Sequence, residues 1–364
     1  MGCLSGQLFY RCRSFCQTNG KAFILPLWIA LIIAACASDK NSKSDSDNET
    51  EVDPFEINCL LAPGINIGNA LEAPTEGEWG VTIKDEYFTI IKNAGFKAVR
   101  IPIRWSAHAA VDTPFTIDPL FQNRIAHVVN VALQQGLAVV INIHHYDEIF
   151  QQPAAHKARL LGLWQQIAEN FKDYPGQLLF EILNEPHDNL TAMLWNQYLL
   201  EALAVIRTTN PLRTVIIGTA EWGGLGALDK LSLSATDTNL IVTVHYYEPF
   251  TFTHQGAEWV SGSNAWLGTT WSATAAQTSA LKQDFDRIKA WADDHHRPVF
   301  IGEFGAYSRA DMTSRMLWTG YVVSQCRQRN FSWAYWEFCA GFGAYDPSSN
   351  TWRQPLLNAL IQIP

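Results

Sequence analysis

Short apolar runs alternate with longer amphipathic stretches from residue 59 to the C-terminus. Eight runs are apolar almost throughout, which is typical of parallel strands buried on both faces. They span residues 64–67, 98–103, 138–143, 178–183, 214–219, 240–246, 298–304 and 332–338. Helical patterns lie between them, among them 84–94, 119–135, 158–171, 191–208, 276–293 and 311–329. This alternation predicts an α/β fold, a (β/α)8 TIM barrel in a single domain.

Turn-forming residues mark where several of these helices should end. Gly95, Gly136 and the pair Asn210-Pro211 each follow a helical pattern, where glycine and proline are common stop signals. A doubly wound sheet is the alternative, but such folds carry a glycine-rich phosphate loop after the first strand, and none follows residues 64–67. No repeat or internal linker suggests a second domain.

The N-terminal segment does not fit the barrel pattern. Basic residues precede an apolar run over residues 22–35, which is shorter than the roughly 20 residues of a membrane span and typical of an export signal. The run ends in Ala34-Ala35-Cys36, which resembles a bacterial lipoprotein signal. We therefore expect a signal peptide over residues 1–35 and lipidation of Cys36. Ordinary secretion after cleavage near Ala35 is the alternative.

Residues 36–56 are polar and acidic and have no apolar periodicity, which predicts a solvated tether before a domain at 57–364. The expected location is therefore the bacterial cell surface or the periplasm, with the lipid as the membrane contact. Of the seven cysteines, Cys59, Cys326 and Cys339 lie in the predicted domain, without metal-ligand spacing. One disulfide among these three is open at this point.

Composition narrows the class of partner. The net charge is −9 and no basic patch stands out, so nucleic acid is not expected as a ligand. The 14 tryptophans are more than a core requires, and flat indole faces suit the apolar faces of sugar rings. A carbohydrate is the partner that this composition favours, and the chain is expected to act as a monomer.

Polar and aromatic side chains follow every predicted strand. In this fold the C-terminal ends of the strands build the active site. The residues at these ends are Asn66, Asn69, Glu72, Arg100, His144, His145, Asn184, Glu185, Glu221, Trp222, His245, Tyr247, Glu303, Trp336 and Glu337. Asn184-Glu185-Pro186 after the fourth strand, together with Glu303 after the seventh, supplies the two carboxylates that glycoside hydrolysis requires.

The sequence resembles glycoside hydrolase family 5 from residue 59 to the C-terminus. The motifs that carry the resemblance are GINIGNALE (64–72), VRIP (99–102), INIHHY (141–146), ILNEP (182–186), HYY (245–247) and WAYWEF (333–338). The pattern is similar to bacterial endoglucanases of this family, including members that accept both β-1,4-glucans and β-mannans. The resemblance implies a single catalytic barrel and a retaining endo-β-1,4-glycanase that acts through a covalent glycosyl-enzyme.

Roles of individual residues follow from that resemblance. It implies that Glu185 is the general acid/base and Glu303 the nucleophile. The resemblance makes Arg100, Asn184, His245 and Tyr247 the remaining catalytic residues. The sugar-binding residues it implies are Asn69, Glu72, His144, His145, His254, Trp259, Trp336, Glu337 and Phe342.

Electrostatics gives the two glutamates different expected protonation states. The positive charge of Arg100 should keep Glu303 ionised, and the negative charge of Glu303 should raise the pKa of Glu185, which keeps the acid protonated.

The sequence supports other classes of function less well. A metal-dependent barrel hydrolase would need convergent histidines, but adjacent residues such as His144 and His145 face opposite sides of a strand. A sugar-binding protein without catalysis would not need both glutamates. A primary action on β-1,4-mannan rather than glucan stays open. Neither a cofactor nor a metal is expected.

Overall fold

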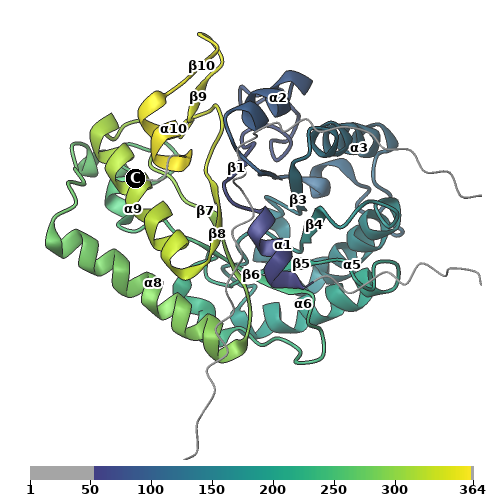
Figure 1. Ribbon diagram of the computed structural model, residues 1–364. Helices are drawn as coiled ribbons and strands as arrows, with labels where there is room; N and C mark the ends of the chain where they lie inside the picture. Colours follow the sequence, from purple (N-terminus) through teal and green to yellow (C-terminus); the bar gives the residue numbers. More distant parts are fainter. Residues whose placement is uncertain (1–52, 362–364) are drawn as a thin grey trace, which may run out of the picture. The chain divides into compact units, whose positions relative to one another are not determined.

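The computed structural model describes residues 53–361, and these belong to one compact unit. Eight parallel strands close into a barrel in sequence order, with β1 hydrogen-bonded to both β2 and β8 (Figure 1). The strands are β1 (Gly64–Asn66), β2 (Ala98–Ile101), β3 (Ala138–Asn142), β4 (Leu178–Glu181), β5 (Val215–Gly218), β6 (Leu240–His245), β7 (Val299–Glu303) and β8 (Ser332–Tyr335). The predicted (β/α)8 barrel is confirmed.

Helices enclose the barrel on its outside (Figure 1). The longer ones are α2 (Asp85–Asn93), α3 (Pro119–Gln134), α5 (Pro153–Asn170), α6 (Ala192–Arg207), α8 (Ala275–His295) and α9 (Met312–Arg329). Shorter helices are α1 (Pro54–Leu60), α4 (Asp147–Gln151), α7 (Phe250–Thr253) and α10 (Gln354–Ile361). A two-stranded hairpin, β9 (Tyr345–Asp346) and β10 (Thr351–Trp352), follows the barrel.

Local sequence explains where the helices begin and end. The side chain of Asp118 accepts hydrogen bonds from the first turn of α3, and Pro119 occupies a position whose N–H would have no partner. Gly95 and Gly136 follow α2 and α3 with φ values of 104° and 70°, which a residue with a Cβ rarely adopts. These two stop signals are therefore confirmed, and the third, Asn210-Pro211, follows the end of α6 at Arg207.

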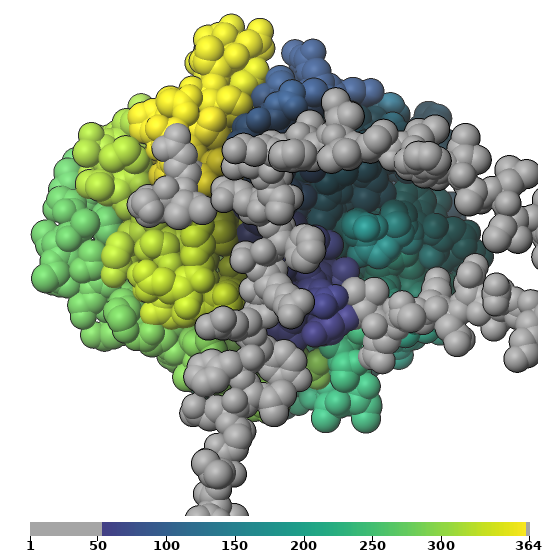
Figure 2. All heavy atoms as spheres, in the orientation of Figure 1, coloured from purple at the N-terminus to yellow at the C-terminus, as the bar shows by residue number. Residues whose placement is uncertain are grey.

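The helix α1 closes the N-terminal end of the barrel. Its Ile57 packs with residues inside the lower barrel, such as Val140 and Phe300, and the Asn58 side chain donates to the carbonyl of Val299 at 3.0 Å. In the space-filling view the purple atoms of α1 lie between the teal and the yellow-green halves of the barrel (Figure 2). The opposite end, where the strands finish, is left for the site.

Some predicted boundaries need correction. The tether was expected to reach residue 56, but α1 begins at Pro54, capped by Asp53. The helix predicted at 158–171 begins at Pro153, because proline at the first position of a helix is tolerated and the polar residues that follow continue the turn. Cys326 is buried and Cys339 is partly buried, and both are thiols. The predicted signal peptide and Cys36 lie outside the described residues.

Within residues 53–361 there is no helix that combines the length and the apolar character needed to cross a membrane.

Candidate active site

The two predicted catalytic glutamates lie at the C-terminal ends of β4 and β7. Glu303 is the last residue of β7, and its side chain is buried. Glu185 follows β4 in a backbone conformation with a φ of 45°, immediately before Pro186, and its side chain is 22% exposed. One carboxylate oxygen of each lies within 4.8 Å of the other. The carboxylate of Glu303 is therefore enclosed, while that of Glu185 is partly accessible to solvent.

A buried arginine connects the two sides of the site. The Arg100 guanidinium donates to Oε1 of Glu303 at 2.7 Å and to Oδ1 of Asn184 at 2.7 Å. It also makes two 2.7 Å bonds to Glu181 and a 2.9 Å bond to Asn66. Burial alone would lower the pKa of Arg100, but the charges of Glu181 and Glu303 raise it above its ordinary value. Arg100 is therefore a permanent cation that fixes Glu303 and Asn184 together.

Tyr247 completes the hydrogen bonding of the Glu303 carboxylate. Its hydroxyl donates to Oε2 of Glu303 at 3.0 Å. Burial, followed by the charge of Glu303, raises the pKa of Tyr247 well above its ordinary value, so the phenol stays protonated and acts as a donor. Both oxygens of Glu303 are thus held, one by Arg100 and one by Tyr247.

His245 lies between the two glutamates. Its Nδ1 is 2.7 Å from Oε1 of Glu185 and 3.6 Å from Oε2 of Glu303. A register shift in the pairing of β6 and β7, between Val244 and His245, places it there. Burial opposes a charge on His245, but the two carboxylates raise its pKa above the ordinary value.

The predicted pKa pattern of the glutamates is wrong for this arrangement. Burial would raise the pKa of Glu185, but the hydrogen bond and charge of His245, followed by the charge of Arg100, lower it. Burial raises the pKa of Glu303, against the lowering effect of His245 and Arg100, and the charge of Glu185 adds to the rise. The prediction considered the neighbouring carboxylate and omitted the imidazole between them.

His144, His145 and Trp336 form a contiguous group of rings, called here the histidine side of the site. The ring of His144 is nearly parallel to the indole of Trp336, with centroids 5.9 Å apart, and His145 meets His144 edge-on at 4.5 Å. The amide of Asn142 lies 3.1 Å from Nδ1 of His144. Burial lowers the pKa of His144 well below its ordinary value, so this ring is neutral.

A second group of predicted residues forms an aromatic wall. The ring of His254 lies 4.9 Å from Tyr247, 5.6 Å from Phe342 and 6.4 Å from Trp259. Burial lowers the pKa of His254 to about 4, so it carries no charge near neutral pH. Trp259 is 61% exposed. This wall offers flat apolar faces to a sugar chain.

The carboxylates of Glu72 and Glu337 accept hydrogen bonds from backbone N–H groups of their own loops. Oxygens of Glu72 accept from the backbone N–H groups of Asn69 and Ala70. Glu337 is fully buried, and its oxygens accept from the backbone of Cys339, Ala340 and Phe342. In this conformation Glu337 holds the loop that carries Phe342 and does not reach the cleft surface. Sugar contact by Asn69 and Glu72 stays a prediction.

Sequence reasoning missed Glu181 as part of the site. It lies inside β4, in a run that is otherwise apolar, and is 1% exposed. A single carboxylate within a buried strand needs a buried cation, and Arg100 on β2 is that cation. A charged residue within an apolar run could therefore have identified Glu181 as part of the site from the sequence alone.

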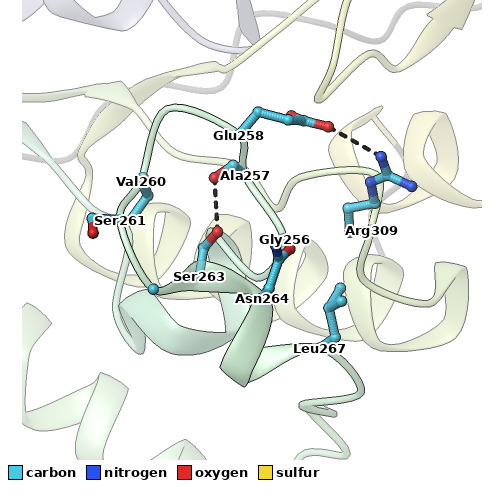
Figure 3. Close-up of a pocket in the computed structure, with 10 residues that line it drawn as sticks. Gly256, Ala257, Glu258, Val260, Ser261, Ser263, Asn264, Leu267 and Arg309 are labelled. Carbon is cyan, nitrogen blue, oxygen red and sulfur yellow. Dashed lines mark hydrogen bonds and ion pairs between the residues drawn. The ribbon is translucent and has the colours of Figure 1, made fainter.

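A separate cavity of about 510 Å³ is lined by residues of the segment 256–267 and by Arg309 (Figure 3). The chain around Trp259 forms one side of it, and the Glu258–Arg309 ion pair borders it. Its lining consists of Gly256, Ala257, Glu258, Val260, Ser261, Gly262, Ser263, Asn264, Leu267 and Arg309. Neither Glu185 nor Glu303 contributes to it, so it is distinct from the catalytic centre.

Glu185, His245 and Glu303 offer ligand atoms within 4.8 Å of one another, close enough to hold a metal ion. The Arg100 guanidinium lies 2.7 Å from Glu303 and already occupies one of its carboxylate oxygens. A dication would have to bind against this fixed positive charge. The cluster is therefore better suited to proton transfer than to metal binding.

A closed (β/α)8 barrel with paired carboxylates at the ends of β4 and β7 defines a glycoside hydrolase. The family model described as Cellulase (glycosyl hydrolase family 5) matches residues 62–341. The chain therefore belongs to glycosyl hydrolase family 5, as its motifs predicted, and is a glycoside hydrolase of the cellulase type.

Characterised relatives are endoglucanases. Endoglucanase H of Acetivibrio thermocellus is 37% identical over 327 residues, which cover 88% of this chain and 35% of that protein. Endoglucanase B of Clostridium cellulovorans is 30% identical over 329 residues, which cover 82% of this chain and 73% of that protein. The chain thus spans about a third of the first relative and nearly three quarters of the second.

Solved structures agree with this assignment. Thermotoga maritima Cel5A in complex with mannotriose is 57% identical, with a TM-score of 0.84, over 85% of this chain and 100% of that chain. The same enzyme in complex with cellobiose is 58% identical, also with a TM-score of 0.84, over 85% of this chain and 100% of that chain.

Proposed function

We propose that this protein is a retaining endo-β-1,4-glycanase that hydrolyses β-1,4-glucan by double displacement, with Glu303 as nucleophile and Glu185 as acid/base. The observation that carries the proposal is the spacing of the two carboxylates, whose oxygens lie within 4.8 Å. Retaining enzymes hold these groups about 5–5.5 Å apart, whereas inverting enzymes need about 6.5–9.5 Å to admit a water molecule between them. The spacing therefore supports direct attack on the sugar.

The first step forms a glycosyl-enzyme. An oxygen of Glu303 bonds to the anomeric carbon while the glycosidic bond breaks, and the departing oxygen takes a proton from Glu185. The hydrogen bond between Nδ1 of His245 and Oε1 of Glu185 provides a route by which a proton held on His245 can reach the acid. Arg100 and Tyr247 keep the attacking carboxylate in one orientation.

The second step releases the product. Glu185, now a carboxylate, removes a proton from water, the water oxygen bonds to the anomeric carbon, and the bond to Glu303 breaks. The Oδ1 of Asn184 is occupied by Arg100, which leaves the NH₂ group of that amide as the donor available to a sugar hydroxyl. Two inversions at one carbon retain the β configuration.

Substrate breadth is part of the proposal. Glucose and mannose differ in the orientation of the 2-hydroxyl, and a site with several polar groups nearby can satisfy either epimer. The Thermotoga maritima neighbour has been crystallised with both mannotriose and cellobiose. We infer that this chain cleaves β-1,4-glucan and, secondarily, β-mannan or glucomannan. A primary mannanase is the second candidate, which the mannotriose complex of that neighbour favours.

Polymer hydrolysis tests the proposal directly. Purified enzyme should lower the viscosity of carboxymethylcellulose much faster than it releases reducing ends, because an endo-acting enzyme cuts inside the chain. The Glu303→Ala variant should do neither. Release of reducing ends without an early fall in viscosity would contradict endo action, and no hydrolysis of any β-1,4-glucan would contradict the function.

We also propose that the protein is exported and anchored by a lipid on Cys36, based on the apolar run and the Ala34-Ala35-Cys36 sequence. Cys36→Ser should move the enzyme from the membrane fraction to the soluble fraction, or block its processing. Wild-type protein that is wholly soluble and carries no lipid on its N-terminal peptide would exclude the anchor.

A further inference from the structure

A buried hydroxyl lies inside the barrel, beneath the catalytic centre. Thr243 on β6 is 1% exposed, and its Oγ1 makes no hydrogen bond with any residue in the described part of the chain. Ile241, two residues earlier on the strand, packs inside the lower barrel, so Thr243 points into the barrel as well. A buried hydroxyl without a protein partner costs free energy and usually binds an ordered water molecule. The mechanism described above does not use this group.

Two glycines on the adjacent strands leave the hydroxyl facing His245. Gly218 on β5 pairs with Thr243, and a Cβ there would lie 3.7 Å from the Thr243 methyl group. A Cβ on Gly302 of β7 would lie 2.5 Å from Oγ1 of Thr243 and 3.3 Å from Nε2 of His245. The hydroxyl and Nε2 therefore border the same point, and a side chain at position 302 would collide with the hydroxyl and crowd the imidazole.

The orientation of the imidazole is fixed. Its Nδ1 makes the contacts with the carboxylates, at 2.7 Å to Glu185 and 3.6 Å to Glu303. A Cβ on Gly223 would lie only 3.2 Å from the ring, and the Gly223 carbonyl accepts from the backbone N–H of His245 at 2.9 Å. Gly223 thus packs against the ring and restricts its rotation, which leaves Nε2 on the side of Thr243.

The charged and titratable groups that face this imidazole come from other strands. They are Glu185 after β4, Glu303 on β7, Arg100 on β2 and His144 after β3. Burial and Arg100 oppose the imidazolium, but the two carboxylates favour it and raise the pKa of His245. An imidazolium has two N–H donors. Glu185 accepts one of them, and the other requires an oxygen near Nε2.

We propose that Thr243 is a positioning residue for proton transfer: its hydroxyl accepts, through one bridging water molecule, the proton of Nε2 and so holds His245 as the tautomer that exchanges protons at Nδ1. The inference rests on the proposed glycanase function and on the proton route from His245 to Glu185. When Nδ1 gives its proton to Glu185, the Nε2 proton stays in place, and the neutral ring can take a proton back at Nδ1. Thr243 is buried below the reacting groups and acts only through His245.

The pH dependence of hydrolysis tests this role. Thr243→Val keeps the shape of the side chain but removes the acceptor, so the imidazolium loses stabilisation and the proton shared by His245 and Glu185 leaves at lower pH. The basic limb of kcat/KM on cellohexaose should therefore move down by about 0.5–1 pH unit, with the plateau within about threefold of wild type. Thr243→Ser keeps the hydroxyl and should keep the wild-type profile. Dinitrophenyl β-cellobioside, whose leaving group needs no proton, should show no such shift.

Thr319→Val is the matched control. Thr319 on α9 also has a buried Oγ1 without a hydrogen-bond partner in the described chain, and its substitution should leave the profile unchanged. An unshifted profile for Thr243→Val, or an equal shift for Thr243→Ser, would overturn the inference. Thr243→Ala also removes the hydroxyl and gives an independent answer if the valine variant does not fold.

A second readout does not depend on activity. Nitrogen-15 NMR titration of the His245 ring, assigned with a His245→Gln variant, should show Nε2 protonated throughout in the wild type and a midpoint about 0.5–1 pH unit lower in Thr243→Val. Equal midpoints would overturn the inference. Failure of the wild-type enzyme on every β-1,4-glucan would instead contradict the proposed function, and the NMR titration would still decide the role of Thr243.

Discussion

Arg100 determines the geometry of the site at the level of single residues. Its five donors are shared among Glu303, Glu181, Asn184 and Asn66, so one planar guanidinium sets the positions of the proposed nucleophile and of the residue that precedes the proposed acid/base. Arg100 is also the buried cation that pairs with the carboxylates of both Glu181 and Glu303.

The roles of the two glutamates can be separated by mutation. Glu185→Ala should lower kcat/KM on natural glucan by about 10²–10⁴-fold, the usual contribution of a general acid, but spare the first step with dinitrophenyl glycosides, whose leaving group needs no proton. Glu303→Ala should abolish activity on both, and azide should restore it by entering the vacated space and forming an α-glycosyl azide. Identical behaviour of the two variants with both kinds of substrate would refute this assignment.

The sequence predicted that Glu185 and Glu303 would lie at strand ends, because apolar runs locate the strands, and the structure places them after β4 and at the end of β7. The apolar runs could not predict which of the two glutamates has the higher pKa. It depends on the position of His245, which a one-residue register shift brings to 2.7 Å from Glu185. A shift of this kind leaves no pattern in a run of apolar residues.

Loops after β1 and β8 shape the cleft at the level of elements. Each is organised by a buried carboxylate, Glu72 or Glu337, that accepts backbone N–H groups. Burial raises the pKa of both groups to about 7, although these backbone hydrogen bonds oppose the rise. The mutual repulsion of the two carboxylates also raises the pKa of Glu72.

These carboxylates make stability depend on pH. Since the pKa of glutamate is 4.5 without the fold, the folded protein binds more protons than the unfolded chain between pH 4.5 and about 7. Their contribution to the free energy of unfolding should therefore fall as the pH rises through this window, by up to about 1.4 kcal/mol per pH unit for each group. Urea unfolding at several pH values should detect it.

Glu72→Gln should make this decline shallower, because one of the two titrating groups is removed. Glu56→Gln, on the exposed side of α1, is the matched control and should leave the slope unchanged. If Glu72→Gln and wild type lose stability in parallel between pH 5 and 7, Glu72 does not titrate in the folded protein as argued.

Helices and strands of ordinary length were predictable because burial repeats along them with a regular period. The missed elements, α4, α10 and the β9–β10 hairpin, are short, and their stability comes from packing. Tyr345 and Trp352 of that hairpin, for example, pack against Phe338 from the β8 loop. Contacts of this kind leave no regular period in the sequence.

At the scale of the whole molecule, the aromatic wall and the histidine side flank one catalytic centre. Trp259, Phe342 and Tyr247 lie on one side, and Trp336 with His144 and His145 lies on the other. Aromatic faces bind the apolar face of a pyranose and depend little on which epimer is present. The polymer class should therefore be set by ring substituents that contact polar groups.

Substrate preference follows from this arrangement. Reducing-end release should be highest on β-1,4-glucan, lower on mannan or glucomannan, and lowest on xylan, which lacks the hydroxymethyl group and its contacts. All substrates should be assayed side by side at equal mass. Good cleavage of glucan with mannan and glucomannan left intact would contradict dual specificity without affecting the glucanase function.

The measurement that tests the central claim most directly is trapping of the glycosyl-enzyme. Wild-type protein treated with a 2-deoxy-2-fluoro cellobioside that carries a good leaving group should gain one fluorocellobiosyl group, attached to the peptide that contains Glu303. Proton NMR of the first product from β-glucan should show the β anomer. A label on another residue, or an α anomer as the first product, would contradict the double displacement through Glu303.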